Sequence, residues 1–368
     1  MTTDNPLGLD GFAFCEFTSP DPTLMAAQLE HLGFTAAARH PERDLTLYRQ
    51  GRIAFVLNVS TTGQAAEFRK LHGPSANGMA FRVADAATAY ALALERGANA
   101  ADATASAFAE AHVIEGIGGS LLYLVDADPF AEWDEVPGWR EEAARNSVGL
   151  DLLDHLTHNV RRGQMRTWSA FYGRIFGFEE QKYFDIKGQA TGLFSQAMIA
   201  PDKAIRIPLN ESQDEHSQIE EFIRDYNGEG IQHLALTTPD IFDTVEKLRA
   251  RGVRLQDTIE TYYDLVDKRV PGHGEDLDRL RENRILIDGD VEKEGLLLAC
   301  PCFGAGSIDE THDLLGDQLG LAERNHCQRY RRLAATGKPQ PKVTTAIARE
   351  LFGYAWDIAR RVSPAIAG

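Results

Sequence analysis

Two stretches, "GMAFRVADAATAYALALERGA" at residues 78–98 and "HLALTTPDIFDTVEKLRARGV" at residues 233–253, decide the fold because they repeat one pattern. Each begins with a short apolar run that is typical of a strand. Each continues at Asp85 or Asp240, and Asp is a preferred residue at a helix N-cap. Apolar residues then recur at helical spacing until an Arg-Gly pair, and Gly is favoured just past a helix end. The pattern predicts a strand followed by a helix in both places.

Further repeats extend this unit. "GLD" occurs at residues 8–10 and again at 149–151, each time before a strand-like run and an amphipathic helix. Other strand-like stretches follow the repeated helices, at residues 118–126 and 294–300. A unit of one strand, one helix and several strands therefore occurs about four times, and internal repeats of this kind define the architecture. The sequence predicts an α+β fold built from about four such units.

The repeats also predict how the chain is divided. We expect an N-terminal domain at residues 1–130 and a second domain at 149–300. The acidic stretch between them predicts a linker at residues 131–148. Composition changes again at about residue 300, and three of the four cysteines lie beyond residue 299. We therefore expect an atypical C-terminal segment at residues 301–368.

Composition narrows the class of function. The chain has 368 residues and a net charge of −17, which disfavours a nucleic-acid-binding protein because such proteins usually carry a basic surface. No apolar run reaches the roughly 20 residues of a membrane span, and the N-terminus lacks the features of a secretory signal. Four cysteines do not make a disulfide framework. We therefore expect a cytoplasmic protein that acts on a small molecule.

Two histidines stand three residues apart in "DLLDHLTHNV" at residues 151–160. Side chains three apart in a strand point to opposite faces, so at most one of His155 and His158 belongs to a single interior site. The repeat gives no support to His158, His216 or His273. We interpret these three as surface or loop residues.

The repeat does support His155 and His233. At the repeat offsets, His155 aligns with Phe14 of the first half and His233 aligns with Gly78. Both histidines thus occupy equivalent places in paired units and could converge on one cavity, whereas the first half could not bind a metal there. A hydrogen-bonded core histidine is the alternative interpretation for each.

Several motifs in order, "GMAFRV", "DHLTHNV", "YFDIKGQATGL", "RIPLNE", "GEGIQHLAL" and "ILIDGD", resemble those of bacterial 4-hydroxyphenylpyruvate dioxygenases. The resemblance covers about Gly8 to Leu298, and the family belongs to the vicinal oxygen chelate superfamily. It implies βαβββ modules that pair into two domains with open, barrel-like sheets.

The resemblance implies an Fe(II) ion held by two histidines and one carboxylate, with His155 of "DHLTH" and His233 of "GIQHLAL" as ligands. Such a triad leaves open positions for a 2-oxo acid and dioxygen. The implied reaction converts 4-hydroxyphenylpyruvate and O2 to homogentisate and CO2 in tyrosine catabolism, and a homo-oligomer is implied. A 4-hydroxymandelate synthase, which shares the fold, metal site and substrate, and an inactive ligand-binding member of the fold are the alternatives.

By the same motif matching, Ser195, Asn210, Gln218 and Gln232 resemble the polar lining of the family's substrate pocket. Hydroxyl and amide groups can orient a carboxylate or a phenol without adding net charge beside a metal. Taken without the motifs, each would be interpreted as a surface polar residue.

The match to the family ends at about Leu298. The family's aromatic strand with a ligating Glu does not follow, and either a frame change or divergence would produce such a break. Glu310 is a candidate third ligand, although Ser307 and Glu310 have the spacing of a helix capping box. The Cys300 and Cys302 pair lacks the C-x₂-C spacing typical of a zinc site.

Overall fold

The fold is seen in a computed structural model that describes residues 5–187, 192–215, 217–253, 255, 258, 260–290 and 295–299. The expectations for His216, for the cysteines from Cys300 onward, for Glu310 and for the segment 301–368 lie outside these residues. No helix in the described ranges is both long enough and apolar enough to cross a membrane.

The first half of the chain forms one eight-stranded sheet with the order β6-β7-β5-β1-β4-β3-β2-β8. Its first unit consists of β1 (Leu9–Thr18), α1 (Pro22–His31), β2 (Thr35–Arg39), β3 (Leu45–Gln50) and β4 (Ile53–Asn58). Its second unit consists of α2 (Gly63–His72), β5 (Ser75–Val83), α3 (Ala86–Glu95), β6 (His112–Glu115), β7 (Leu121–Val125) and β8 (Asp134–Glu135). Short 3-10 turns lie at Ala103–Ala105 and Ile117–Gly119, and helix α4 (Trp139–Asn146) leads to the second half.

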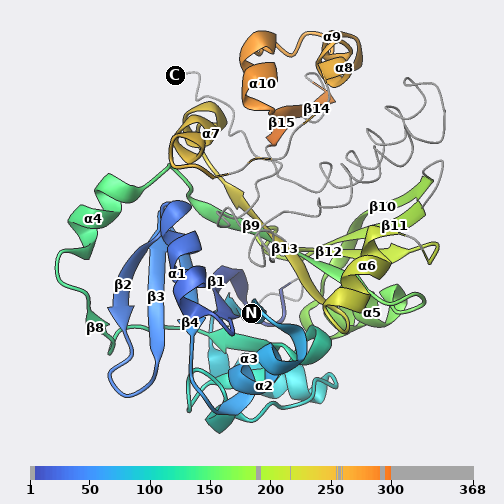
Figure 1. The fold of residues 1–368 in the computed structure, drawn as a ribbon. Helices are drawn as coiled ribbons and strands as arrows, with labels where there is room; N and C mark the ends of the chain where they lie inside the picture. Colours follow the sequence, from blue (N-terminus) through green and yellow to red (C-terminus); the bar gives the residue numbers. More distant parts are fainter. Residues whose placement is uncertain are drawn as a thin grey trace.

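The second half forms a five-stranded sheet with the order β10-β11-β12-β9-β13 (Figure 1). Its first unit consists of β9 (Leu152–Val160), α5 (Met165–Phe176), β10 (Glu179–Lys187), β11 (Gly192–Ile199) and β12 (Arg206–Ser212). Its second unit begins with α6 (Gln218–Asp225), β13 (Gly230–Thr237) and α7 (Ile241–Ala250). It continues with the short helices α8 (Glu260–Tyr263), α9 (Val266–Arg269) and α10 (Leu277–Asn283), and ends with β14 (Leu286–Asp290) and β15 (Gly295–Ala299).

The strand register confirms the internal repeat. Glu16 on β1 pairs with Gly78 on β5, and at the repeat offsets these positions correspond to Thr157 on β9 and His233 on β13, which also pair. The strand order β5-β1-β4-β3-β2 recurs as β13-β9-β12-β11-β10. The α+β fold of repeated modules expected from the sequence is therefore confirmed.

The two halves differ where β6 and β7 extend the first sheet. Strand β7 pairs in parallel with β5, but β14 and β15 form a separate two-stranded sheet. The physical reason is a second core, because the helices between α7 and β14 bury their own apolar cluster with the hairpin, including Val245, Tyr263 and Ile287. Figure 1 shows α8, α9, α10 and the hairpin grouped together beyond α7.

The predicted helix ends are confirmed in both repeated helices. The side chain of Asp85 accepts a hydrogen bond from the backbone N–H of Thr88 at 2.7 Å, and Asp240 does the same for Asp243 at 3.0 Å. Just past each helix, a glycine adopts a positive φ, which a residue without a Cβ tolerates at little cost. Local sequence chemistry thus sets the length of both helices.

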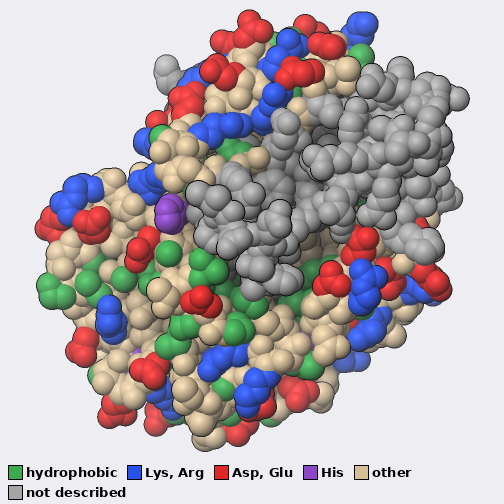
Figure 2. Space-filling model, in the orientation of Figure 1, with side chains coloured by type: hydrophobic (Ala, Val, Ile, Leu, Met, Phe, Trp, Pro, Cys, Tyr) green, Lys and Arg blue, Asp and Glu red, His purple; other side chains and the backbone are tan. Residues whose placement is uncertain are grey.

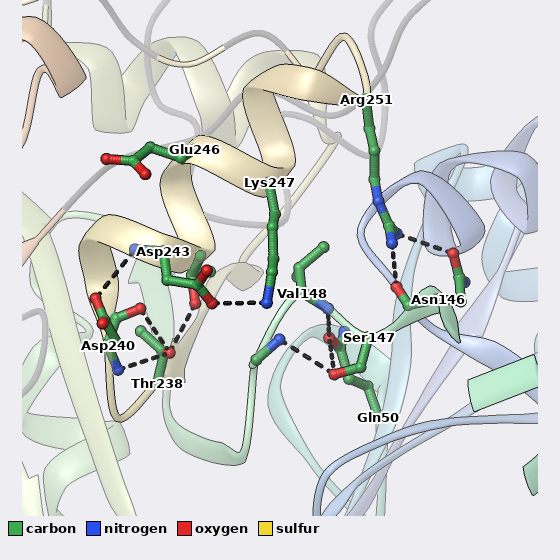
Figure 3. A network of polar contacts seen from close by, with 12 residues as sticks. Gln50, Asn146, Ser147, Val148, Thr238, Asp240, Asp243, Glu246, Lys247 and Arg251 are labelled. Atoms are coloured by element: carbon green, nitrogen blue, oxygen red, sulfur yellow. Dashed lines mark hydrogen bonds and ion pairs between the residues drawn. The ribbon is translucent and has the colours of Figure 1, made fainter. Parts of the chain in front are cut away.

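The end of α4 and the residues that follow it are bonded to both halves (Figure 3). From the second half, the Arg251 guanidinium at the end of α7 donates to the side-chain oxygen of Asn146 at 2.9 Å and also to its carbonyl oxygen. From the first half, the Gln50 side-chain oxygen accepts from the backbone N–H of Val148 at 2.7 Å. These bonds hold the two halves together at the connection.

The interpretation of His158 as a surface or loop residue is wrong. His158 lies within β9 and is fully buried, with its Nε2 atom 2.7 Å from the hydroxyl of Tyr172 on α5. It shares the face of β9 that packs on α5 with Leu156, and the Tyr172 hydroxyl gives one of its two ring nitrogens a partner in the core. His273 does lie in a loop, between α9 and α10.

Candidate metal and substrate site

The opposite face of β9 carries a row of polar side chains. His155, Thr157 and Asn159 alternate along the strand, so they share one face, and all three are buried. A buried row of three polar residues requires partners or a ligand, because unpaired polar groups in an interior cost free energy. This face is where the candidate site is built.

His155 and His233 are brought together by the pairing of β9 with β13. Their ring centroids are 5.5 Å apart and the ring planes are inclined by 72°. A register shift between Ile231 and His233 interrupts the ladder next to the pair. The structure thus places both predicted metal ligands on adjacent strands, close enough for their rings to bind the same metal ion.

Each imidazole is oriented by the residue that precedes it in sequence. The Nδ1 atom of His155 lies 3.0 Å from a carboxylate oxygen of Asp154, while its Nε2 atom is buried and has no hydrogen-bond partner among the described residues. The Nδ1 atom of His233 lies 2.5 Å from the amide oxygen of Gln232, and its Nε2 atom lies 3.0 Å from the hydroxyl of Thr157. A buried Nε2 atom without a protein partner is the arrangement expected of a metal ligand.

Electrostatics favours the neutral form of His233. Burial, together with the nearby His155 and His158, lowers the pKa of His233 well below its usual range. A neutral imidazole keeps the lone pair that a metal requires. Asp154 is itself paired, since its other oxygen lies 3.0 Å from the guanidinium of Arg206. The donor chemistry therefore fits two of the three protein ligands of an iron site.

The third ligand is not provided by the residues that can be described. In these ranges, no group of three or more His, Cys, Asp or Glu side chains is arranged to hold a metal ion. The candidate third ligand, Glu310, lies outside them. The site as described is a pair of histidines.

Two of the four predicted pocket residues line up beside this pair. Ser195 on β11 pairs in register with Asn210 on β12, and Asn210 pairs with Asn159 on β9. All three are buried, and the side-chain oxygens of Asn159 and Asn210 have no hydrogen-bond partner among the described residues. In-register residues share a face of a sheet, so this row continues the polar face that carries His155.

The other two predicted residues occupy different places. Gln232 contacts the ring of His233 from the preceding position on β13. Gln218 is the first residue of α6, a helix that contacts β9 and β12, and both of its side-chain amide atoms are buried without a hydrogen-bond partner in the described ranges. Asn210 and Gln218 therefore have amide atoms without a partner in the described part of the chain, whereas Gln232 orients a histidine.

Sequence reasoning missed Asn159, Thr157, Asp154 and Arg206. The alternation of polar residues at 155, 157 and 159 was a usable signal for the first two. The pairing of Asp154 with Arg206 had no local signal, because the two residues come from different strands.

Comparisons with known proteins identify the family of this chain. Residues 3–135 match the family model described as hydroxyphenylpyruvate dioxygenase, N-terminal, and residues 152–266 match the glyoxalase, bleomycin resistance protein and dioxygenase superfamily. A 4-hydroxyphenylpyruvate dioxygenase of Pseudomonas aeruginosa is 53% identical over 305 residues, which are 80% of this chain and 84% of the relative. A Vibrio vulnificus protein called hemolysin VllY is 52% identical over 307 residues, 80% of this chain and 85% of that protein.

One solved structure shows the same fold. A mutant of 4-hydroxymandelate synthase from Streptomyces coelicolor superposes with a TM-score of 0.70 and 23% identity. The superposition covers 87% of this chain and 99% of the other. At this identity the likeness concerns the fold alone.

Proposed function

The chain belongs to the 4-hydroxyphenylpyruvate dioxygenase family, and from that premise we propose that it uses Fe(II) to convert 4-hydroxyphenylpyruvate and O2 to homogentisate and CO2. As a member of this family the chain is a dioxygenase, an oxidoreductase of tyrosine catabolism. The observation that carries the proposal for the site is the buried pair His155 and His233, in which the Nε2 atom of His155 lacks a partner among the described residues.

In this proposal His155 and His233 hold the iron, with a carboxylate from outside the described residues as third ligand. When bound, the iron supplies the activation of dioxygen and the oxidation of the 2-oxo acid. The protein supplies the two imidazoles and their orientation. Burial of both rings keeps bulk water away from the bound ion, which protects a reactive site from side reactions.

The polar row beside the histidines orients the substrate. The side-chain oxygens of Asn159 and Asn210 need donors or a bound group, and their amide nitrogens can donate to a carboxylate or a phenol oxygen. Ser195 lies next in the same row, and Gln218 on α6 adds an amide that has no hydrogen-bond partner among the described residues. We assign the substrate-positioning role to these residues, and to Gln232 the orientation of His233.

The surface supports a small-molecule substrate rather than a polyanion or a membrane. Figure 2 shows acidic and basic side chains interspersed on the face drawn, and the net charge of the chain is −17. A binding surface for nucleic acid would concentrate Lys and Arg on one side. We propose a cytoplasmic homo-oligomer that binds the 2-oxo acid and O2, and neither nucleic acid nor membranes.

The proposal is tested with protein loaded anaerobically with Fe(II). We expect near-stoichiometric iron and oxygen uptake that depends on 4-hydroxyphenylpyruvate, with homogentisate as the product identified by chromatography. A His233→Ala variant should lose both iron and uptake, whereas His273→Ala, in the loop between α9 and α10, should keep both. Formation of 4-hydroxymandelate would identify the synthase instead. Folded protein that binds no iron would identify an inactive member of the fold.

A further inference from the structure

We propose that Asp154 and Arg206 are positioning residues that fix the tautomer of His155, so that its Nε2 atom presents a lone pair to the metal. The inference rests on the proposed function, in which His155 is a ligand. It concerns two residues that lie outside the ligand set itself and outside the polar lining of the substrate site.

The contact between Asp154 and His155 determines which nitrogen carries the proton. An ionised carboxylate can only accept hydrogen bonds, so Nδ1 of His155 must donate across the 3.0 Å that separates it from Asp154. A neutral imidazole has one N–H, and therefore Nε2 is left as the bare nitrogen. That atom is buried and has no partner among the described residues, and the ring lies 5.5 Å from the ring of His233.

Arg206 holds the carboxylate in the position that this requires. Its guanidinium lies 3.0 Å from the second oxygen of Asp154, whose side chain is only 6% exposed. Arg206 also pairs in register with His155 across β12 and β9, so the ion pair and the ring share one section of the sheet. A buried carboxylate is costly to desolvate unless it is paired, and Arg206 provides that pair.

The two histidines are oriented by different chemistry. Gln232 contacts His233 through a neutral amide that can turn over, whereas Asp154 presents an acceptor to His155 in either orientation. Partners behind a ligating histidine typically change metal affinity by ~10–100-fold when they are removed. The structure assigns this role at His155 to the Arg206–Asp154 pair.

An Asp154→Asn substitution tests the logic because Arg206 dictates how the new amide turns. The guanidinium has only donors, so it attracts the Asn oxygen and leaves the Asn NH2 facing His155. That NH2 requires Nδ1 as an acceptor, which moves the ring proton to Nε2 and blocks the metal. An Asp154→Asn/Arg206→Met double variant removes the donor that turns the amide this way, and we expect the original tautomer to return.

The first readout needs no metal. Histidine-selective ¹⁵N NMR on the metal-free full chain reports which ring nitrogen is protonated, with His155 assigned from a His155→Gln spectrum. We expect the proton on Nδ1 in the wild type, on Nε2 in Asp154→Asn, and on Nδ1 again in the double variant. A wild-type proton on Nε2 overturns the proposal without any variant.

The second readout is affinity for Co(II), a coloured probe ion, followed by its visible absorption beside a His233→Ala control. We expect a ~10–100-fold loss of affinity in Asp154→Asn and recovery of most of it in the double variant. Wild-type affinity in Asp154→Asn, or a double variant weaker than the single one, overturns the inference while the proposed function stands. A wild type that binds no Co(II) removes the proposed function and this inference together.

Discussion

A buried carboxylate in the first half offers a sharp test of the energetics of this fold. Glu16 occupies the position that Thr157 has in the second half, and it is fully buried. One of its oxygens accepts from the side-chain amides of Asn58 and Asn77 at 2.7 and 2.8 Å, and the other accepts from the Tyr123 hydroxyl at 2.6 Å. Burial raises the pKa of Glu16, and these hydrogen bonds act against that rise.

The perturbation is Tyr123→Phe, which removes one hydroxyl and keeps the ring. The ring packs against Phe14 and Phe108 with centroids 5.3 and 5.8 Å away, and these contacts remain. A hydrogen bond to a charged group contributes ~1.5–3 kcal/mol, and here its loss leaves a buried carboxylate oxygen short of a donor. We expect the free energy of unfolding to fall by ~2 kcal/mol at pH 8, and the melting temperature by ~4–8 °C.

The loss depends on pH in a defined direction. Because the folded pKa of Glu16 is raised, the stability linked to its protonation is complete below the unfolded value of 4.5 and is lost as the pH rises through the folded pKa. The Tyr123 bond favours the ionised form, so its removal raises the folded pKa of Glu16 further. The Tyr123 hydroxyl also accepts from the backbone N–H of Ala107 at 3.2 Å, and the loss of that bond does not depend on pH. The difference between Tyr123→Phe and the wild type should therefore be smallest at pH 4 and should grow towards pH 8.

Urea denaturation at pH 4 to 8, with Tyr172→Phe as the matched control, measures this difference. The Tyr172 hydroxyl contacts His158, whose pKa is lowered by burial to about 3, so both partners are neutral throughout this range. The control should lose ~1 kcal/mol, almost independently of pH. Equal losses for Tyr123→Phe at pH 5 and pH 8, or a loss below ~0.5 kcal/mol at pH 8, would refute the assignment of a charged Glu16 that depends on Tyr123.

Three further predictions concern the helix cap, the connection between the halves and the buried histidine. Replacing the N-cap residue Asp240 with Ala should lower the free energy of unfolding by ~1 kcal/mol in urea denaturation. Arg251→Ala removes both donors to Asn146 and should cost ~1–2 kcal/mol. Lys247→Ala, which breaks only an exposed ion pair on the same helix, should cost less than ~0.5 kcal/mol in the same assay. Because the pKa of His158 is about 3 in the fold and 6.5 unfolded, its stabilising contribution is present above pH 6.5 and is lost as the pH falls towards 3. The wild type should lose up to ~1.4 kcal/mol per pH unit there, and His158→Gln should flatten this acid limb of a pH–stability curve.

Local chemistry made much of the fold predictable. The caps at Asp85 and Asp240 and the glycines after their helices are set by residues within a few positions, so a sequence pattern is sufficient to find them. The internal repeat predicted that His155 and His233 stand at equivalent positions of paired units. The register shows why, because Glu16 pairs with Gly78 as Thr157 pairs with His233. Two strands with the same register bring the same positions together in both halves.

Contacts between distant segments were beyond the same reasoning. His158 was misplaced because alternation states which face of β9 it occupies, but not that α5 covers that face and offers the Tyr172 hydroxyl. The separate β14–β15 sheet was also not foreseen, because the apolar cluster that holds it involves helices between residues 260 and 283, which the first half lacks.

The sequence by itself determined the repeated module, the helix ends and the two histidines at equivalent positions, since each depends on short-range periodicity or on matching one half with the other. Only the tertiary structure decided which groups surround those histidines. Asp154 pairs with Arg206 on the neighbouring strand. Asn159, Asn210 and Ser195 lie in register on three adjacent strands. The reason is physical: the burial of a side chain and its partners depend on which strands become neighbours, and no local sequence pattern encodes which strands those are.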